Sequence, residues 1–385
     1  MVPQQAYGAA LRFPETMNCF KVAIHSTNRD TDVKEAKYKR PRMIDIAREA
    51  NVNRITVSRA LSRPDLVADE TLQRINKAIA KAGYIPDQVA RGLKSERSKI
   101  VTLVTPPQMA GVYGSMLEQL ALELHAGGLI VNLFPLLDAE EQREATLREL
   151  AGWRPAAIVL FGASLNENMR ETLRNTRSPS IELLNYDENG PLACIGYDQS
   201  AAALQLSRHL LDRGYRRMAY VHSANPLSSM NIKRVTGFAD GIRNAGGAFF
   251  AVGGDDEFAG ANGPDVRGLE LKANPTFIEG FELMSRLAAS DRIPDAMLFA
   301  SDMVAVGALQ FCLLNGLRVP RDVALCAFDG TELASVVQPG LTSLDAPFEK
   351  IAQKGAQEIL RLTQDGDTEI RRICVATQII HRDST

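Results

Sequence analysis

Five side chains within one short segment have types suited to contacting a nucleic-acid duplex: Arg54, Ile55, Thr56, Ser58 and Arg59. Arginine donates paired hydrogen bonds to guanine edges and to phosphates, hydroxyl groups contact phosphates or bases, and an apolar side chain packs on the thymine methyl group. We expect Arg54 and Ile55 to contact base edges. Thr56, Ser58 and Arg59 are expected to bind phosphates or bases, which would make the segment a DNA-contacting surface.

Two short helices joined by a turn are expected to position these side chains. Apolar residues recur three or four positions apart over residues 43–50, which predicts the first helix. Asn53 can cap the next helix, in which Val57, Ala60 and Leu61 face inward. The pattern is typical of a helix-turn-helix, whose second helix enters the major groove. Taken alone, it fits a pair of small surface helices equally well.

The charge distribution separates this part of the chain from the rest. Residues 34–99 contain 16 of the 44 Lys and Arg residues but only 8 of the 46 Asp and Glu residues, so they have a net charge of +8 and the remainder −10. A basic module joined to an acidic body is typical of a nucleic-acid binder with a second, separate domain. A solvated basic face is the alternative.

Cysteine usage and hydropathy argue against a disulfide-bonded, membrane or secreted protein. The five cysteines are odd in number and widely spaced, so we expect buried thiols rather than disulfides, and neither a metal site nor a cofactor. No apolar run reaches about 18 residues, and the N-terminus lacks the pattern of a secretory signal. These features predict a cytoplasmic, nucleoid-associated protein without a membrane partner. Residues 1–40 are expected to be a disordered extension or sequence translated from upstream of the true start.

A third helix, at about residues 69–82, is predicted to complete a small domain over residues 41–85. Residues 86–98 follow as a linker with a short helix that has Ala90 and Leu93 on one side. Isolated helices shorter than about 12 residues are marginal in water, so this helix is expected to need DNA or a second copy of the chain. A plain charged linker is the alternative.

From residue 99 onward, apolar runs alternate with helical patterns, which predicts parallel sheets with crossover helices. The alternation restarts after Asp198, so two doubly wound subdomains are expected. Ligands of such sheets bind outside the carboxyl ends of the strands, here in the cleft between two lobes. We expect lobe 1 to span about residues 99–198 and 347–370, and lobe 2 about residues 199–346 and 371–385.

Six ordered blocks resemble the LacI/GalR family of bacterial transcription repressors: IDIAREANVNRITVSRAL, KAGYIPDQVARGLKSERS, GYDQSAAALQLSRHLLDRGYRRMAYV, SDMVAVGALQFCLLNGLRVPRDVALCAFDGTELA, PGLTSL and TQIIHRDST. The resemblance covers about residues 42–385, and GWRPAAIVL is loosely similar to gluconate-type repressors. It implies an all-α helix-turn-helix head and an α/β body of two doubly wound parallel-sheet subdomains, of the periplasmic-binding-protein-like type I. It further implies a homodimer on palindromic double-stranded operator DNA, with a small sugar or sugar acid as effector.

The resemblance also assigns single residues. Leu93 falls on the leucine that these repressors insert into the minor groove, where an apolar wedge unstacks a base step, and Ala90 lies beside it. Arg54 and Ile55 fall on variable specificity positions, and Thr56, Ser58 and Arg59 on more uniform contact positions. The positions carried over for the effector cleft are Asn185, Arg234, Ser301, Asp302, Asp329 and Tyr113.

The chemistry of this set suits a polyol, because guanidinium and carboxylate groups bind hydroxyls or a ligand carboxylate in pairs. Two of the residues have structural alternatives. Asp302 could cap the helix that begins at Met303, and Tyr113 could pack on the core instead of stacking on a sugar.

Two other functions compete with that of a DNA-binding regulator. A solute-binding protein would have the same two lobes, but the basic head and the missing signal sequence argue against it. An enzyme of the doubly wound class would need catalytic motifs, and GxGxxG, GxxxxGK[ST], GxSxG and HExxH are all missing. The histidines, at positions 25, 125, 209, 222 and 381, show no ligand spacing. We therefore expect a regulator without catalytic residues.

Overall fold

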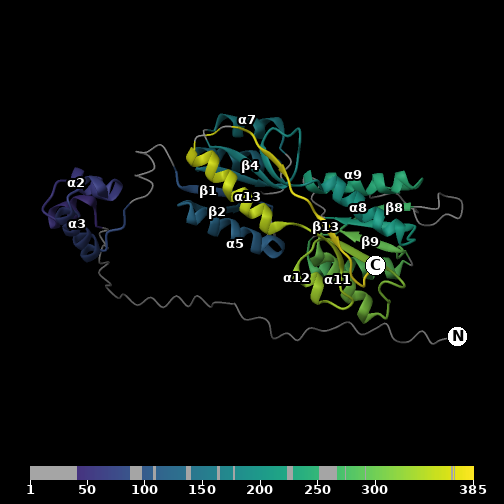
Figure 1. Cartoon of the computed structure of the whole chain (residues 1–385). Coiled ribbons are helices and arrows are strands. Elements are labelled where there is room, and N and C mark those ends of the chain that lie inside the picture. Colours follow the sequence, from purple (N-terminus) through teal and green to yellow (C-terminus); the bar gives the residue numbers. More distant parts are fainter. Residues whose placement is uncertain are drawn as a thin grey trace, which may run out of the picture. The chain divides into compact units, whose positions relative to one another are not determined.

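The computed structural model of the chain (Figure 1) describes residues 41–86, 98–106, 110–135, 140–162, 165–176, 178–222, 229–250, 267–273, 275–290, 292–365, 367 and 369–385. The chain forms two compact units, Met1–Asp87 and Gln88–Thr385. Residues 1–40 and the predicted short helix with Ala90 and Leu93 lie outside the described residues. So does most of the Gly- and Asp-rich segment that follows residue 250.

The first unit contains the expected three-helix head. It consists of α1 (Met43–Glu49), α2 (Arg54–Ser62), a 3-10 turn (Pro64–Leu66) and α3 (Asp69–Ala82). Asn53 caps α2 as predicted, because its Oδ1 accepts a hydrogen bond of 2.8 Å from the Thr56 amide. Gly83 ends α3 in the left-handed conformation, with φ of +61°. Buried apolar side chains from all three helices form one small core, centred on Ile46, Val57 and Ile75.

Lobe 1 of the second unit is a six-stranded, all-parallel sheet in the order β12-β5-β4-β3-β1-β2. Its helices cover both faces, α5 and α13 on one and α6 and α7 on the other, and α13 (yellow) lies beside α5 (blue) in Figure 1. The elements are β1 (Ile100–Thr105), α5 (Ala110–Ala126), β2 (Ile130–Pro135), α6 (Glu140–Gly152), β3 (Ala157–Phe161), α7 (Glu167–Asn175), β4 (Ser180–Asn185), β5 (Ala193–Tyr197), α13 (Phe348–Leu360) and β12 (Arg372–Cys374).

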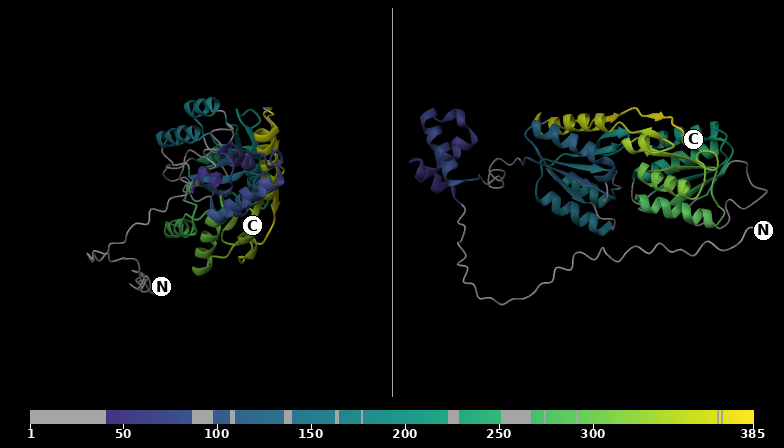
Figure 2. Two further views of the ribbon diagram at one scale, coloured as in Figure 1. Left: turned by 90° about the vertical axis from the view of Figure 1, so that its left-hand side faces the viewer. Right: turned by 90° about the horizontal axis from the view of Figure 1, so that it is seen from below.

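Lobe 2 is a seven-stranded sheet in the order β13-β11-β10-β9-β6-β8-β7, parallel except for β13. Helices α8 and α9 pack on one face and α10 and α11 on the other (Figure 2). The elements are α8 (Gln199–Asp212), β6 (Arg217–His222), α9 (Ser229–Asn244), β7 (Ala248–Phe250), β8 (Arg267–Lys272), α10 (Phe277–Ala289), β9 (Ala296–Phe299), α11 (Asp302–Leu314), β10 (Ala324–Asp329), α12 (Glu332–Val336), β11 (Thr342–Asp345) and β13 (Gln378–Ile380).

The predicted fold class is confirmed, and the differences concern short strands and the third crossing between lobes. Strand β12 pairs with β5 of lobe 1, and β13 pairs with β11 of lobe 2. The chain therefore crosses to lobe 2 after Cys374, whereas lobe 2 was expected to resume at about residue 371. The expectation of uniformly buried thiols is wrong for Cys374, which is exposed on the edge strand β12.

Membrane-spanning helices and metal-binding clusters are both missing from the described residues. None of the helices there combines the length and apolar character that a bilayer-spanning helix requires. The same part of the chain contains no group of three or more His, Cys, Asp or Glu side chains arranged to hold a metal ion.

Candidate functional site

The outer face of α2 presents the side chains singled out in the sequence. Arg54, Ile55 and Arg59 are exposed, whereas Thr56 and Ser58 are half-buried. Ile55 is 69% exposed although the opposite face of the same helix is in the core, so its exposure comes from its position and not from disorder of the helix. The Thr56 hydroxyl already donates to Asn53 Oδ1 at 3.0 Å. Because a DNA phosphate only accepts hydrogen bonds, the hydroxyl can donate to it only by giving up this contact.

Arg234 is the centre of the polar residues between the two lobes. Its side chain is buried, and its guanidinium lies over the Phe328 ring at 4.0 Å. Nε donates to Gln199 Oε1 at 2.7 Å, and Nη1 donates to the Ala300 carbonyl at 2.9 Å. Nη2 donates to the Tyr197 hydroxyl, also at 2.7 Å. Because Tyr197 ends β5 of lobe 1, this guanidinium links the two lobes.

Asp329 lies at the carboxyl end of β10 and is also buried. Neither of its carboxylate oxygens has a hydrogen-bond partner of good geometry within the described residues. Its pKa is raised to about 7, mainly by burial and also by the charge of nearby Asp302, although the Arg234 guanidinium and weaker interactions with Ser301 and the Asp302 backbone oppose the rise. Its backbone has a φ of +101°, which is strained for a residue with a side chain. Strain and unmet acceptors at one residue are typical of a ligand site.

The alternative that Asp302 caps α11 is wrong, because Ser301 is the cap and accepts a bond of 3.3 Å from the Met303 amide. Asp302 instead fixes the loop after β10. Its Oδ2 accepts from the amide and the hydroxyl of Thr331, at 2.7 and 2.9 Å, and its Oδ1 accepts from the Ser343 hydroxyl at 2.8 Å. Burial raises its pKa. Since both oxygens are occupied, Asp302 shapes the site more than it offers a free acceptor.

Asn185 brings a second acceptor from lobe 1, at the carboxyl end of β4. The side chain is buried, and its Nδ2 donates to Glu182 Oε1 at 3.0 Å, whereas Oδ1 has no partner among the described residues. Burial raises the pKa of Glu182 to about 7, opposed by the hydrogen bond from Asn185. The preceding Leu184 has a φ of +73°, and its carbonyl accepts from Gln199 Nε2 at 2.7 Å. Gln199 thus contacts both Arg234 and the strand end that contains Asn185.

Tyr113 lies at a kink in α5, where its backbone leaves the helical conformation. Its ring makes an edge-to-face contact with Phe348, with 5.1 Å between centroids. Burial raises the pKa of its hydroxyl, the charge of Asp329 raises it further and that of Arg234 lowers it, so the phenol lies close to both groups. The ring therefore packs on Phe348, as the structural alternative expected, and the hydroxyl lies near the polar centre. Stacking on a sugar stays a prediction.

Several residues of this centre were not predicted. Tyr197 and Gln199 flank Asp198, Tyr220 and His222 lie near the end of β6, and Phe328 precedes Asp329. Their sequence signal is their position at or next to the carboxyl ends of parallel strands, where ligands of such sheets bind. Among the described residues, unpartnered polar atoms collect along these strand ends and the start of α9: Asn185 Oδ1, Asp329 Oδ1 and Oδ2, His222 Nδ1 and Ser229 Oγ.

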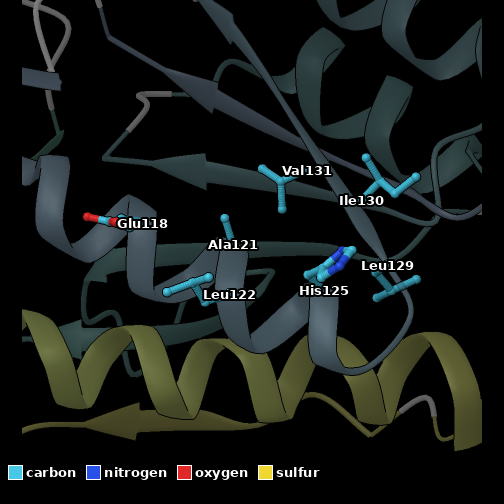
Figure 3. A pocket seen from close by; sticks show the side chains of 7 residues that line it. All are labelled: Glu118, Ala121, Leu122, His125, Leu129, Ile130 and Val131. Carbon is cyan, nitrogen blue, oxygen red and sulfur yellow. The ribbon is translucent and has the colours of Figure 1, made fainter.

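A hollow on lobe 1 is distinct from this polar centre (Figure 3). It lies between α5 and the edge strand β2, and Leu122 and Ile130 in its wall are 59% and 55% exposed. Apolar side chains dominate it, and none of the predicted cleft residues lines it. Its lining residues are Glu118, Ala121, Leu122, His125, Leu129, Ile130 and Val131.

A helix-turn-helix head followed by a two-lobed α/β body with a buried polar centre defines a DNA-binding regulator with a ligand-binding body. The chain belongs to the lacI family of bacterial regulatory proteins: that family's model matches residues 42–87, and the model of a periplasmic binding protein-like domain matches residues 207–385. It is accordingly a DNA-binding transcriptional regulator and not an enzyme. A solute-binding protein is not favoured, because the head matches this family.

Relatives of known type support this assignment over most of the chain. The HTH-type transcriptional regulator GntR of Pseudomonas aeruginosa is 28% identical over 346 residues, which cover 90% of this chain and 96% of the relative. Catabolite control protein A of Staphylococcus xylosus is 25% identical over 353 residues, covering 89% and 98%. Among solved structures, the Lac repressor dimer bound to operator and the anti-inducer ONPF has a TM-score of 0.74 at 20% identity, covering 90% and 99%. A complex of the regulator CelR with cellobiose has a TM-score of 0.61 at 22% identity, covering 90% and 100%.

Proposed function

We propose that the protein is a homodimeric repressor of palindromic operator DNA, acting at the nucleoid in the cytoplasm, whose operator affinity is set by a small sugar or sugar acid between the two lobes. The effector contacts proposed are Asn185, Arg234, Ser301, Asp302, Asp329 and Tyr113. The observation behind the effector is the set of buried, unpartnered acceptors around Arg234. A buried acceptor without a partner costs about 1–3 kcal/mol, so a ligand that donates several hydroxyl hydrogen bonds would gain affinity there.

The first turns of α9 contact lobe 1. A ligand in the cleft could shift the two lobes relative to each other at these contacts. Lys233 Nζ donates to the Tyr186 carbonyl at 2.9 Å and lies 3.5 Å from Asp187 Oδ2. The Ser229 amide donates to the Gly162 carbonyl at 3.2 Å. An effector that binds one arrangement of the lobes more tightly changes operator affinity by the ratio of its two affinities.

A ligand screen tests the effector proposal directly. Full-length protein is heated with aldoses, alditols, aldonates and phosphosugars, because a ligand at about 100 times its dissociation constant adds about 2.7 kcal/mol of stability. Compounds that raise the melting temperature are then titrated against the operator complex. A panel without any stabilising compound, or one whose binders leave operator affinity unchanged, would contradict the proposed effector control.

Exposed apolar side chains on lobe 1 support the homodimer. Ile130 and Leu133 lie on β2, which is the edge strand of its sheet, and are 55% and 53% exposed. Leu122 of α5 and Ile130 both line the hollow in Figure 3. An exposed apolar edge strand favours association with another chain. Sedimentation of the wild type and of Leu133→Lys should report a dimer and a weakened dimer, respectively.

Arg54→Ala is expected to relax base preference at one operator position at a cost of about 1–3 kcal/mol, because the exposed guanidinium at the start of α2 loses a paired contact with a base edge. Titration of a set of operator variants measures both quantities. Arg74→Ala on α3 is a control with the same change of charge. Unchanged affinity and preference in the Arg54 variant would remove this residue from the DNA contacts.

Leu93→Ala is expected to weaken operator binding while leaving effector binding nearly intact. The reason is the proposed wedge role of Leu93 beside Ala90, since an apolar side chain inserted at a base step stabilises the bent duplex. Operator titration and effector calorimetry on the same preparation separate the two activities. Equal losses in both would indicate that this segment is structural instead.

A further inference from the structure

His222 forms a buried pair with a carboxylate, and neither residue belongs to the effector contacts proposed above. It is the last residue of β6 and is 6% exposed. Its Nε2 lies 2.6 Å from Oε1 of Glu270, on the neighbouring strand β8. The imidazole ring also stacks on Tyr220, with 5.6 Å between centroids and 16° between planes. The ring is thus held on one edge and one face, while its Nδ1 has no partner among the described residues.

The Glu270 contact fixes the chemistry of the other ring nitrogen. An ionised carboxylate only accepts hydrogen bonds, so the proton of the neutral ring resides on Nε2. Nδ1 then has a free lone pair and is an acceptor. As long as the ring is neutral, a protein group or ligand that satisfies Nδ1 must donate a hydrogen.

The position of His222 near the polar centre of the cleft indicates that a ligand donates the hydrogen bond to its Nδ1. Tyr220 precedes it by two residues and therefore lies on the same face of the sheet. Burial raises the pKa of the Tyr220 hydroxyl and the nearby charge of Arg234 opposes the rise, so the phenol lies close to the guanidinium at the centre of the cleft. Strand β6 pairs with β9, and β9 pairs with β10, which ends at Asp329. His222 and Asp329 thus lie at the carboxyl edge of the same sheet.

We propose that His222 is a specificity-determining contact of the effector, whose Nδ1 accepts a hydrogen bond from a ligand hydroxyl, and that Glu270 is its positioning residue. The inference rests on the proposed effector function. It narrows the ligand class, because a hydroxyl can donate to Nδ1 whereas an ionised carboxylate or a deoxy carbon cannot. Together with the unpartnered oxygens of Asn185 and Asp329, it favours a neutral polyol over a sugar acid.

Two isosteric variants separate the two nitrogens of the ring. His222→Gln keeps an amide nitrogen near the Nε2 position for Glu270 but has no acceptor at the δ position. His222→Asn places Oδ1 near the Nδ1 position and gives up the Glu270 contact. With the tightest-binding compound of the screen as probe, calorimetry on the full-length protein is expected to show about tenfold weaker binding for His222→Gln and a change of under about threefold for His222→Asn.

Matched controls distinguish ligand contact from loss of structure. His209→Gln changes a half-buried histidine of α8 whose Nε2 contacts Thr385 Oγ1, outside the cleft, and should bind the probe normally. Glu270→Ala should weaken binding, whereas Glu270→Gln, which still offers an oxygen to Nε2, should restore most of it. Circular dichroism and melting curves confirm that each variant is folded.

The outcomes separate this inference from the function on which it rests. A probe that stabilises the wild type and alters operator affinity, yet binds His222→Gln with unchanged affinity, overturns the role of His222 and leaves the effector function standing. Tighter binding of the probe's 1-carboxylate analogue than of the neutral probe would also overturn the role of His222. A wild-type protein that binds no compound in the screen contradicts both.

Discussion

Asp329→Asn is expected to make the protein more stable at pH 8 and, at the same time, to weaken effector binding. The wild-type carboxylate is buried without hydrogen-bond partners of good geometry, and its pKa rises from 3.8 to about 7. Because this folded-state pKa is above the unfolded one, the folded protein binds more protons between these two values. Stability is therefore fully present below about pH 4 and is lost as the pH rises toward 7.

The size of the effect follows from the shift in pKa. A rise from 3.8 to about 7 corresponds to a loss on the order of 4 kcal/mol in the wild type above pH 7. Asparagine has no such ionisation, although its amide, if left without partners, costs about 1–3 kcal/mol. The net gain at pH 8 should therefore be roughly 1–3 kcal/mol, and it should shrink and reverse toward pH 4.

Denaturant unfolding of the wild type and Asp329→Asn between pH 4 and pH 8 measures this difference. Asp322→Asn is a control of opposite sign, because the Arg318 side chain holds the pKa of that carboxyl down at about 2. Its removal should cost stability at neutral pH. Effector affinity of Asp329→Asn should fall about tenfold or more, since a charged acceptor is lost. A stability difference independent of pH would show that Asp329 is not a destabilised carboxylate.

Sequence patterns predicted the elements whose signal is local. The head was found because its apolar residues recur at helical spacing and Asn53 is a capping residue. The long buried strands and their crossover helices were found for the same reason. Strand β5 was missed because Gly196 interrupts its short apolar run, and β8 because charged residues alternate with apolar ones in it. Such short strands are defined by their partners in the sheet.

Some residues of the candidate site could likewise be predicted from the sequence, and others could not. Arg234 and Asp329 could be predicted because the resemblance to the family identified them. Tyr197, Gln199 and His222 could not, since their roles depend on which strand ends and helix starts meet in space. The number of free hydrogen-bond acceptors could not be predicted from the sequence either. Asp302 and Asp329 are both cleft carboxylates, yet only packing decides that the first is occupied and the second is not.

Different residues of the cleft make its internal hydrogen bonds and offer free acceptors to a ligand. Three nitrogens of Arg234 are already bonded, two of them to Gln199 and Ala300 within lobe 2 and the third to Tyr197 of lobe 1. The free acceptors are on neighbouring strand ends instead. A ligand that binds these acceptors can alter the fit of the lobes around Arg234 without replacing any of its bonds. The placement of α9 on α8 should therefore be the most sensitive point of the body.

Gly237→Ala tests that placement and is expected to disturb the packing of the body more than any of the other substitutions. Gly237 lies on α9 three residues after Arg234, where α9 crosses the start of α8. A methyl group at this glycine would be 2.0 Å from the Ser200 carbonyl oxygen and 2.8 Å from its carbon. These are backbone atoms and cannot rotate away, so the two helices must separate. The cost should be at least about 1–3 kcal/mol, the usual range for overpacking a core.

The same separation should disable the cleft, because Ser200 follows Gln199, the partner of Arg234 Nε at 2.7 Å. We expect Gly237→Ala to melt several degrees below the wild type, at about 2–4 °C per kcal/mol for a unit of this size, and to bind the effector at least about tenfold more weakly. Thr236→Ala is the matched control on the exposed side of the same helix, where the hydroxyl donates to the Ile232 carbonyl at 2.9 Å. It should change stability by less than about 0.5 kcal/mol. A Gly237→Ala protein with normal stability and effector affinity would mean that the close crossing of α8 and α9 does not position Arg234.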